Sequence, residues 1–176
     1  LTDDGIAVEF EALNRSASEA PFAIGSHPYL QISPFDTADL VLTTTAASVV
    51  LTDERMLPVQ KIATAGTDFD LSAGRPLCKT HLDNSFTDLV FDEEARALTY
   101  LEAPDGTVVG LWQSSELKHT CIFSPDNYPA ADGTIKAIAI EPQTSAANSF
   151  NTGQDLIWLQ PGQIWGARWG ITVFNR

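Results

Sequence analysis

The sequence predicts an all-β protein built as an antiparallel β-sandwich or barrel. Short apolar runs recur along the chain, turn-forming residues separate them, and no window keeps the 3.6-residue apolar period of a helix beyond two turns. Many short strands joined by regular turns are typical of antiparallel sandwiches and barrels. The chain has 176 residues, 44% of them hydrophobic, so it can bury a substantial core, and we expect one domain over residues 1–176.

The expected strands follow from local patterns. Residues 6–11 (IAVEFE) alternate apolar and polar side chains, which is the two-residue period of a half-buried strand. Further strands are expected at residues 40–42, 98–101, 108–112, 120–123, 135–140, 156–159 and 169–174. Residues 104–106 (PDG) predict a hairpin, and 131–133 (ADG), 151–153 (NTG) and 161–162 (PG) predict turns. Residues 52–79 have a weaker pattern, which favours long loops with short strands and a place for a binding rim.

The charge of the chain limits its partners. The formal net charge is −13 and the pI is near 4.3, a field that repels nucleic acid and anionic membrane surfaces. No apolar run approaches the roughly 20 residues of a membrane-spanning helix. We therefore expect neither a nucleic-acid nor a membrane partner.

The cysteines and histidines suggest no metal site and no disulfide framework. Cys78 and Cys121 lack the spacing of metal ligands, and Cys121 in an apolar run is expected to pack as a small hydrophobe. His81 and His119 have no carboxylate or cysteine at a convincing metal spacing. We expect no metal and no other cofactor, and the cysteine usage makes a reducing, cytoplasmic compartment the default.

His27 is the first candidate for chemistry. It lies in the segment GSHPY, where the following proline restricts it to an extended backbone and so fixes the direction of its imidazole. A histidine can donate or accept a proton near neutral pH. The alternative is a histidine whose nitrogens only satisfy nearby backbone groups, and the pentapeptide alone favours this alternative.

Glu141 is the second candidate. An apolar run, residues 138–140 (IAI), ends in this carboxylate, which is again followed by a proline. A glutamate that extends a buried strand loses hydration, which raises its pKa toward that of a useful general base. The alternative, at about even odds, is a glutamate that emerges at the sheet edge into water.

Asp83 is the third candidate. Residues 81–86 (HLDNSF) place polar groups beside an aromatic ring, a composition that suits hydrogen bonding to hydroxyl groups, with Asp83 binding a pair of them. Asp-Asn-Ser is also ordinary turn chemistry, and taken alone that interpretation is favoured.

Together these segments resemble the aldose 1-epimerases, also called galactose mutarotases. Residues 20–30 (APFAIGSHPYL) resemble the histidine block of the family, and residues 52–58 (TDERMLP) its central loop. Residues 82–89 (LDNSFTDL) resemble the aspartate block, and residues 140–151 (IEPQTSAANSFN) the glutamate block. The tail follows with residues 159–163 (LQPGQ) and 169–171 (WGI). Each block is a weak match, whereas all of them in order are fairly specific and cover nearly the whole chain.

The resemblance implies a fold and a set of roles. The fold is the galactose mutarotase-like supersandwich, His27 is the general acid, Glu141 the general base, and Asp83 binds sugar hydroxyls. The implied substrate is a hexose such as glucose or galactose, whose α and β anomers interconvert by acid–base ring opening without a metal or a nucleotide. Each proton transfer contributes on the order of 10²- to 10⁴-fold to the rate.

The start of the chain differs from the family pattern. The sequence opens at Leu1 without an initiator Met or a signal segment, and family members carry an N-terminal half with further strands, another histidine and more substrate contacts. We therefore expect a C-terminal part of such a protein, with that missing half as a partner. We also expect this chain alone to be poorly active or inactive, so mutarotation of α-glucose or α-galactose at a family-like rate in polarimetry would contradict the expectation.

Three other functions stay open. A hexose-6-phosphate 1-epimerase would keep the acid and base but need clustered arginines, whereas Arg15, Arg75 and Arg168 are scattered. A non-catalytic carbohydrate-binding β-sandwich would bind sugar without turning it over. A glycosidase would use Asp83 and Glu141 as its carboxylate pair and leave His27 without a role.

Overall fold

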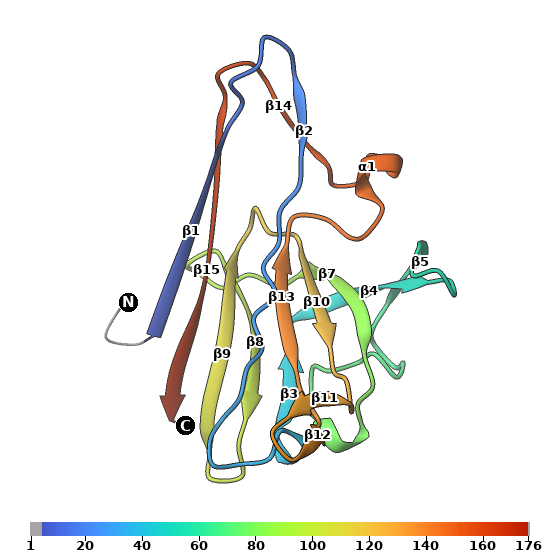
Figure 1. The fold of residues 1–176 in the computed structure, drawn as a ribbon, viewed down its shortest axis with the longest axis vertical. Helices are drawn as coiled ribbons and strands as arrows, with labels where there is room; N and C mark the ends of the chain where they lie inside the picture. The colour runs from blue at the N-terminus through green and yellow to red at the C-terminus, as the bar shows by residue number, and fades with distance from the viewer. Residues whose placement is uncertain (1–4, 176) are drawn as a thin grey trace.

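The computed structural model describes residues 5–175 and consists almost entirely of antiparallel strands. Two sheets form the body, a six-stranded sheet in the order β1-β15-β9-β8-β3-β6 and a five-stranded sheet in the order β13-β10-β7-β4-β5. Figure 1 shows β1 and β15 as a long ribbon along one side of the molecule. The predicted all-β, antiparallel class is confirmed, while the unusual opening residues 1–4 lie outside the described part of the chain.

The six-stranded sheet comprises β1 (Gly5–Leu13), β3 (Val41–Thr44), β6 (Arg75–Pro76), β8 (Arg96–Glu102), β9 (Thr107–Ser114) and β15 (Ile164–Asn175). The five-stranded sheet comprises β4 (Ala46–Thr52), β5 (Pro58–Ala63), β7 (Asp83–Leu89), β10 (His119–Phe123) and β13 (Ala139–Gln143). Two small ribbons pair β2 (Ala20–Phe22) with β14 (Ile157–Leu159), and β11 (Tyr128–Ala130) with β12 (Gly133–Ile135). One helical turn, α1 (Ser149–Thr152), and 3₁₀ turns at Thr37–Asp39 and Leu77–Lys79 complete the described elements.

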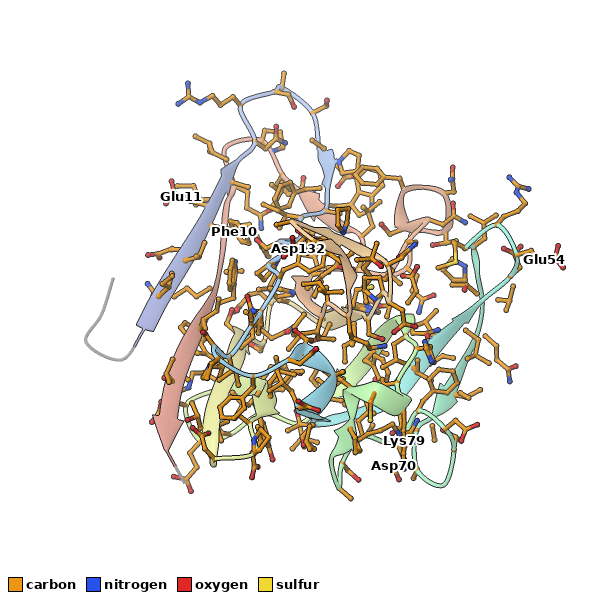
Figure 2. The ribbon with its side chains drawn as sticks, turned by 60° about the horizontal axis from the view of Figure 1, so that its bottom comes forward. Phe10, Glu11, Glu54, Asp70, Lys79 and Asp132 are labelled. Atoms are coloured by element: carbon orange, nitrogen blue, oxygen red, sulfur yellow. The ribbon has the colours of Figure 1, made fainter. Side chains whose placement is uncertain are left out.

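The core lies between the two sheets. Leu42, Leu101 and Leu111 from the six-stranded sheet share one cluster with Phe86 and Ile122 from the five-stranded sheet, and all five side chains are fully buried. Alternation along each strand sends every second side chain into this cluster. On β1, neighbouring Phe10 and Glu11 project to opposite sides, Phe10 toward the body and Glu11 away from it (Figure 2).

Most predicted strands and turns are confirmed. Residues 104–106 turn between β8 and β9, residues 131–132 connect β11 to β12, and residues 161–162 lie between β14 and β15. The short strand β5 lies within the weakly patterned region 52–79, as expected. Of the turn predictions, only residues 151–153 need correction, because they end α1, whose C-cap Gly153 has a left-handed backbone.

Several strand predictions need correction. Residues 135–140 were expected as one strand, but β12 ends at Ile135 and β13 begins at Ala139. Between them the buried Lys136 ammonium donates hydrogen bonds to the carbonyls of Thr80 and Ser124, which holds this stretch off the sheet. Strands β2, β4 and β11 had no predicted counterpart, and residues 83–85, favoured as a turn, begin β7.

No helix among residues 5–175 is long and apolar enough to cross a membrane.

Candidate functional site

His27 and Glu141 meet because an extended segment runs along the free edge of β13. Gly25 pairs opposite Gln143 and Tyr29 opposite Ala139, and this register places His27 directly opposite Glu141. Side chains opposite each other on antiparallel strands share a face. Pro28 and Pro142, which follow these two residues, have no N–H to donate. Their carbonyls still accept hydrogen bonds across the pair, Pro142 O from Ser26 N (3.1 Å) and Pro28 O from Ile140 N (3.3 Å).

The imidazole and the carboxylate are in direct contact. His27 Nε2 lies 3.0 Å from Glu141 Oε1, and the His27 side chain is 51% exposed whereas that of Glu141 is only 8% exposed. The His27 ring also packs near the Tyr29 ring (centroids 5.1 Å apart) and the Phe123 ring (6.4 Å). The geometry differs from both alternatives, because His27 Nε2 contacts a carboxylate and the Glu141 side chain is buried at the sheet edge and not solvated there.

The second oxygen of Glu141 is fixed as well. Gln143 Nε2 donates a hydrogen bond of 3.1 Å to Glu141 Oε2. Burial raises the pKa of Glu141 above its ordinary value; the nearby His27 opposes this rise, the negative charge of Asp83 adds to it, and the Gln143 bond opposes it. A carboxylate with a raised pKa is a stronger base, which suits proton abstraction near neutral pH.

The cross-strand register sets the remaining groups around the pair. Glu141 on β13 lies opposite Cys121 on β10, Cys121 opposite Ser85 on β7, and Ser85 opposite Val50 on β4. These four side chains therefore form one row on the face of the five-stranded sheet that points away from the core. Asp83 precedes Ser85 by two residues and joins the same face.

A cavity of about 440 Å³ lies over this face. Strands β7, β10 and β13 contribute Asp83, Ser85, Cys121 and Gln143 to its lining, and the wall is made by residues 23–25, the β4–β5 hairpin and residues 145–150. Glu141 lies beside the lining, next to Gln143 and Cys121. The cavity is large enough for a hexose, and its lining combines apolar side chains with a few polar groups, as small-molecule sites do.

The structure brings the three predicted site residues together and adds others. Asp83 is close enough for its charge to act on Glu141. Sequence reasoning assigned no role to Gln143 or Ser85, although their two-residue spacing from Glu141 and Asp83 on strands was a usable signal. Cys121, expected to pack as a small hydrophobe, lines the cavity, and burial together with the charges of Glu141 and Asp83 raises its pKa to about 12, so the thiol stays protonated.

None of the four tryptophans lines the cavity, and the buried Trp169 and half-buried Trp165 pack with the core. Cys78 and Cys121 are free thiols. Among residues 5–175, no three His, Cys, Asp or Glu side chains gather in a way that could hold a metal ion.

The comparison with protein families shows to which family the chain belongs. The aldose 1-epimerase family model matches residues 1–172. The chain belongs to the aldose 1-epimerase family. Its fold is shared by a galactose mutarotase-like protein from Clostridium acetobutylicum, at 22% identity and a TM-score of 0.80 over 98% of this chain and 53% of that one. Galactose 1-epimerase from Lactobacillus acidophilus matches at 18% identity and a TM-score of 0.76, over 98% of this chain and 54% of that one.

A relative is also found in Escherichia coli K12. The uncharacterized protein YihR is 22% identical over 165 residues, which cover 90% of this chain and 48% of YihR. This aldose 1-epimerase family chain thus spans about half the length of these relatives. The predicted galactose mutarotase-like fold is confirmed by the structural matches.

Proposed function

We propose that this site interconverts the α and β anomers of an unphosphorylated hexose, with Glu141 as general base and His27 as general acid. The observation that carries the proposal is the 3.0 Å contact between His27 Nε2 and Glu141 Oε1 beside a cavity of about 440 Å³. The C1 hydroxyl and the ring oxygen of an aldose are both bonded to C1. One carboxylate and one imidazole held this close can therefore serve both oxygens at once.

The reaction follows from the two proton transfers. Glu141 removes the proton from the C1 hydroxyl while protonated His27 gives a proton to the ring oxygen, so the bond between C1 and that oxygen breaks and C1 becomes an aldehyde carbon. Rotation about the C1–C2 bond presents the other face of the aldehyde. The ring closes with the roles reversed, and Glu141 and His27 return to their starting protonation states. Binding in one orientation supplies further acceleration, because both transfers need good alignment.

The lining of the cavity favours a neutral sugar. Of the described residues, those that line it include Asp83 but no lysine or arginine. Arg168 is paired with Glu9 and Arg75 bonds the carbonyl of Asp68, so neither is positioned as a phosphate ligand of this cavity. We expect a faster rate on glucose than on glucose 6-phosphate, and the reverse order would favour the hexose-6-phosphate 1-epimerase alternative. A cytoplasmic location and a partnership with an N-terminal half stay predictions.

The substitution Glu141→Gln separates catalysis from binding. It keeps the size of the side chain and a hydrogen-bonding partner for Gln143 but removes the base, so we expect mutarotation measured by polarimetry to fall to the buffer rate, a loss of up to about 10²- to 10⁴-fold. Sugar affinity should stay within a few-fold. Glu11→Gln is the matched control, because Glu11 projects away from the body on β1 (Figure 2). A parent protein that binds sugar with Glu141 intact and never speeds mutarotation would be a carbohydrate-binding module instead.

A further inference from the structure

Beside the acid–base pair lies a second hydrogen-bonded chain of three side chains, from Ser85, His119 and Asp155. Ser85 Oγ lies 3.0 Å from His119 Nδ1, and His119 Nε2 lies 3.0 Å from Asp155 Oδ2. His119 is 1% exposed and Asp155 26% exposed. The other oxygen of Asp155 accepts a hydrogen bond of 3.2 Å from Lys118 Nζ.

The direction of the hydrogens follows from the chemistry of these groups. Burial opposes ionisation of Asp155, but the bonds from His119 and Lys118 outweigh it and lower the pKa of Asp155, so its carboxylate can only accept. His119 Nε2 must therefore carry a hydrogen and donate a hydrogen bond to Asp155 Oδ2. Burial lowers the pKa of His119, so its ring is neutral near pH 7 and Nδ1 is an acceptor. The Ser85 hydroxyl must then donate its hydrogen to Nδ1.

Toward the cavity, Ser85 can therefore only accept hydrogen bonds. Ser85 lines the cavity together with Asp83, and it lies in the same cross-strand row as Glu141. Its only hydrogen is used by His119, so its oxygen offers lone pairs and no donor. We propose that Ser85 binds a ring hydroxyl of the sugar as a hydrogen-bond acceptor, and that His119 and Asp155 are positioning residues that hold Ser85 in this state. The inference rests on the proposed function, because it places a sugar in the same cavity.

The arrangement also has a purely structural interpretation. Asp155 lies in the loop between α1 and β14, and the preceding residues 145–150 form a wall of the cavity. His119 could hold that loop in place without any contact between Ser85 and a ligand. The two interpretations differ in what Ser85→Ala does, since this substitution leaves the bond between His119 and Asp155 intact.

The first test is substitution of Ser85 combined with sugars that lack one hydroxyl. In Ser85→Ala we expect the Kd or KM for the parent hexose to rise about three- to tenfold, the worth of one neutral hydrogen bond, with kcat changed less than twofold. Affinity is measured by NMR titration of each monodeoxy hexose. For one of these sugars the wild-type chain and Ser85→Ala should bind equally, because the partner hydroxyl is already gone. Ser115→Ala, in the exposed turn before β10, is the matched control.

The second test needs no sugar. The ¹⁵N chemical shifts of the His119 ring in the wild-type chain should show a protonated Nε2 and an unprotonated Nδ1. The opposite tautomer overturns the inference, and so does a Ser85→Ala variant that binds every sugar as the wild-type chain does. If the wild-type chain itself binds no aldose, the proposed function fails together with the inference, and the failure is then seen in the wild type and not only in the variant.

Discussion

At the scale of single residues, the site depends on one carboxylate held at an energetic cost. Glu141 is almost fully buried, its two oxygens are bound by His27 and Gln143, and the charge of Asp83 acts on it from β7. Burial and the like charge both oppose ionisation, whereas His27 favours it. The pKa of Glu141 is therefore set by its neighbours, and this affects both the pH dependence of catalysis and the stability of the fold.

The first prediction concerns the pH dependence of catalysis. Glu141 must be ionised to act as base, so kcat/KM should fall as the pH is lowered through its raised pKa, at a midpoint above the 4.5 of an ordinary glutamate. Asp83→Asn removes the repulsion and should move this midpoint to lower pH, besides weakening sugar binding several-fold. The measurement is the initial rate of mutarotation across the acid range. A midpoint that does not move, or moves up, would contradict the assignment of Asp83 as a neighbour that raises the pKa.

The second prediction concerns stability. Because the pKa of Glu141 is higher in the folded than in the unfolded chain, its contribution to stability is fully present below the unfolded pKa and is lost as the pH rises through the folded pKa. Near pH 7 the folded chain therefore carries the cost of a buried charge. Glu141→Gln should raise the Tm at pH 7, and the difference should shrink as the pH falls through the raised pKa of Glu141, with no further change below about 4.3, the pKa of an unfolded glutamate. Equal or lower Tm values for Glu141→Gln at pH 7 in thermal melts would count against this account.

At the scale of elements, the packing of β15 against its neighbours depends on one glycine. A Cβ on Gly170 would contact the Ile6 carbonyl oxygen and lie 2.6 Å from atoms of the Trp112 ring, so the ring covers the glycine closely. Gly166, on the same strand, is less crowded, since a Cβ there would lie 3.3 Å from the Phe10 carbonyl oxygen. Both glycines pair with residues of β1, and among the described residues β15 is the sheet neighbour of β1.

The two glycines form a matched pair for a test. Gly170→Ala should lower the free energy of unfolding by about 1–3 kcal/mol, because it overpacks a filled contact. Gly166→Ala should change it by less than about 0.5 kcal/mol, as surface substitutions usually do. Urea unfolding of both variants measures the difference. Equal effects in the two variants would show that the Trp112 contact does not restrict Gly170.

The elements also show how far the sequence could be interpreted. Strands with clean alternation or apolar runs, such as β1, β9 and β10, were predictable from side-chain period. The interruption of the strand within residues 135–140 was not, because it begins at Lys136, whose burial depends on hydrogen bonds to the carbonyls of Thr80 and Ser124. Residues 83–85 are polar enough to predict a turn, yet they begin β7 because Ser85 and Asp83 face the cavity and Phe86 faces the core.

At the scale of the whole molecule, one face of the five-stranded sheet packs in the core and the other forms the floor of the candidate site. Phe86, Ile122 and Ile140 point inward and are fully buried in the core, while their neighbours Ser85, Cys121 and Glu141 point outward and form the floor of the site. The candidate acid, base and sugar-binding aspartate were named from the sequence because their blocks resemble a family. The direct contact between His27 and Glu141 was not predictable, because it depends on pairing between residues 25–29 and β13, more than a hundred residues apart. The chain of Ser85, His119 and Asp155 was missed for the same reason.

The central claim is that His27 and Glu141 together transfer the protons that interconvert anomers. Exchange NMR at anomeric equilibrium tests it directly, because it follows the α and β signals of glucose or galactose with the purified chain present and detects slow catalysis. We expect exchange faster than in buffer for the wild-type chain, although slow for this family, and exchange at the buffer rate for Glu141→Gln and for His27→Asn. Acceleration that survives in Glu141→Gln, or exchange at the buffer rate in a full-length parent protein that binds sugar with Glu141 intact, would contradict the claim.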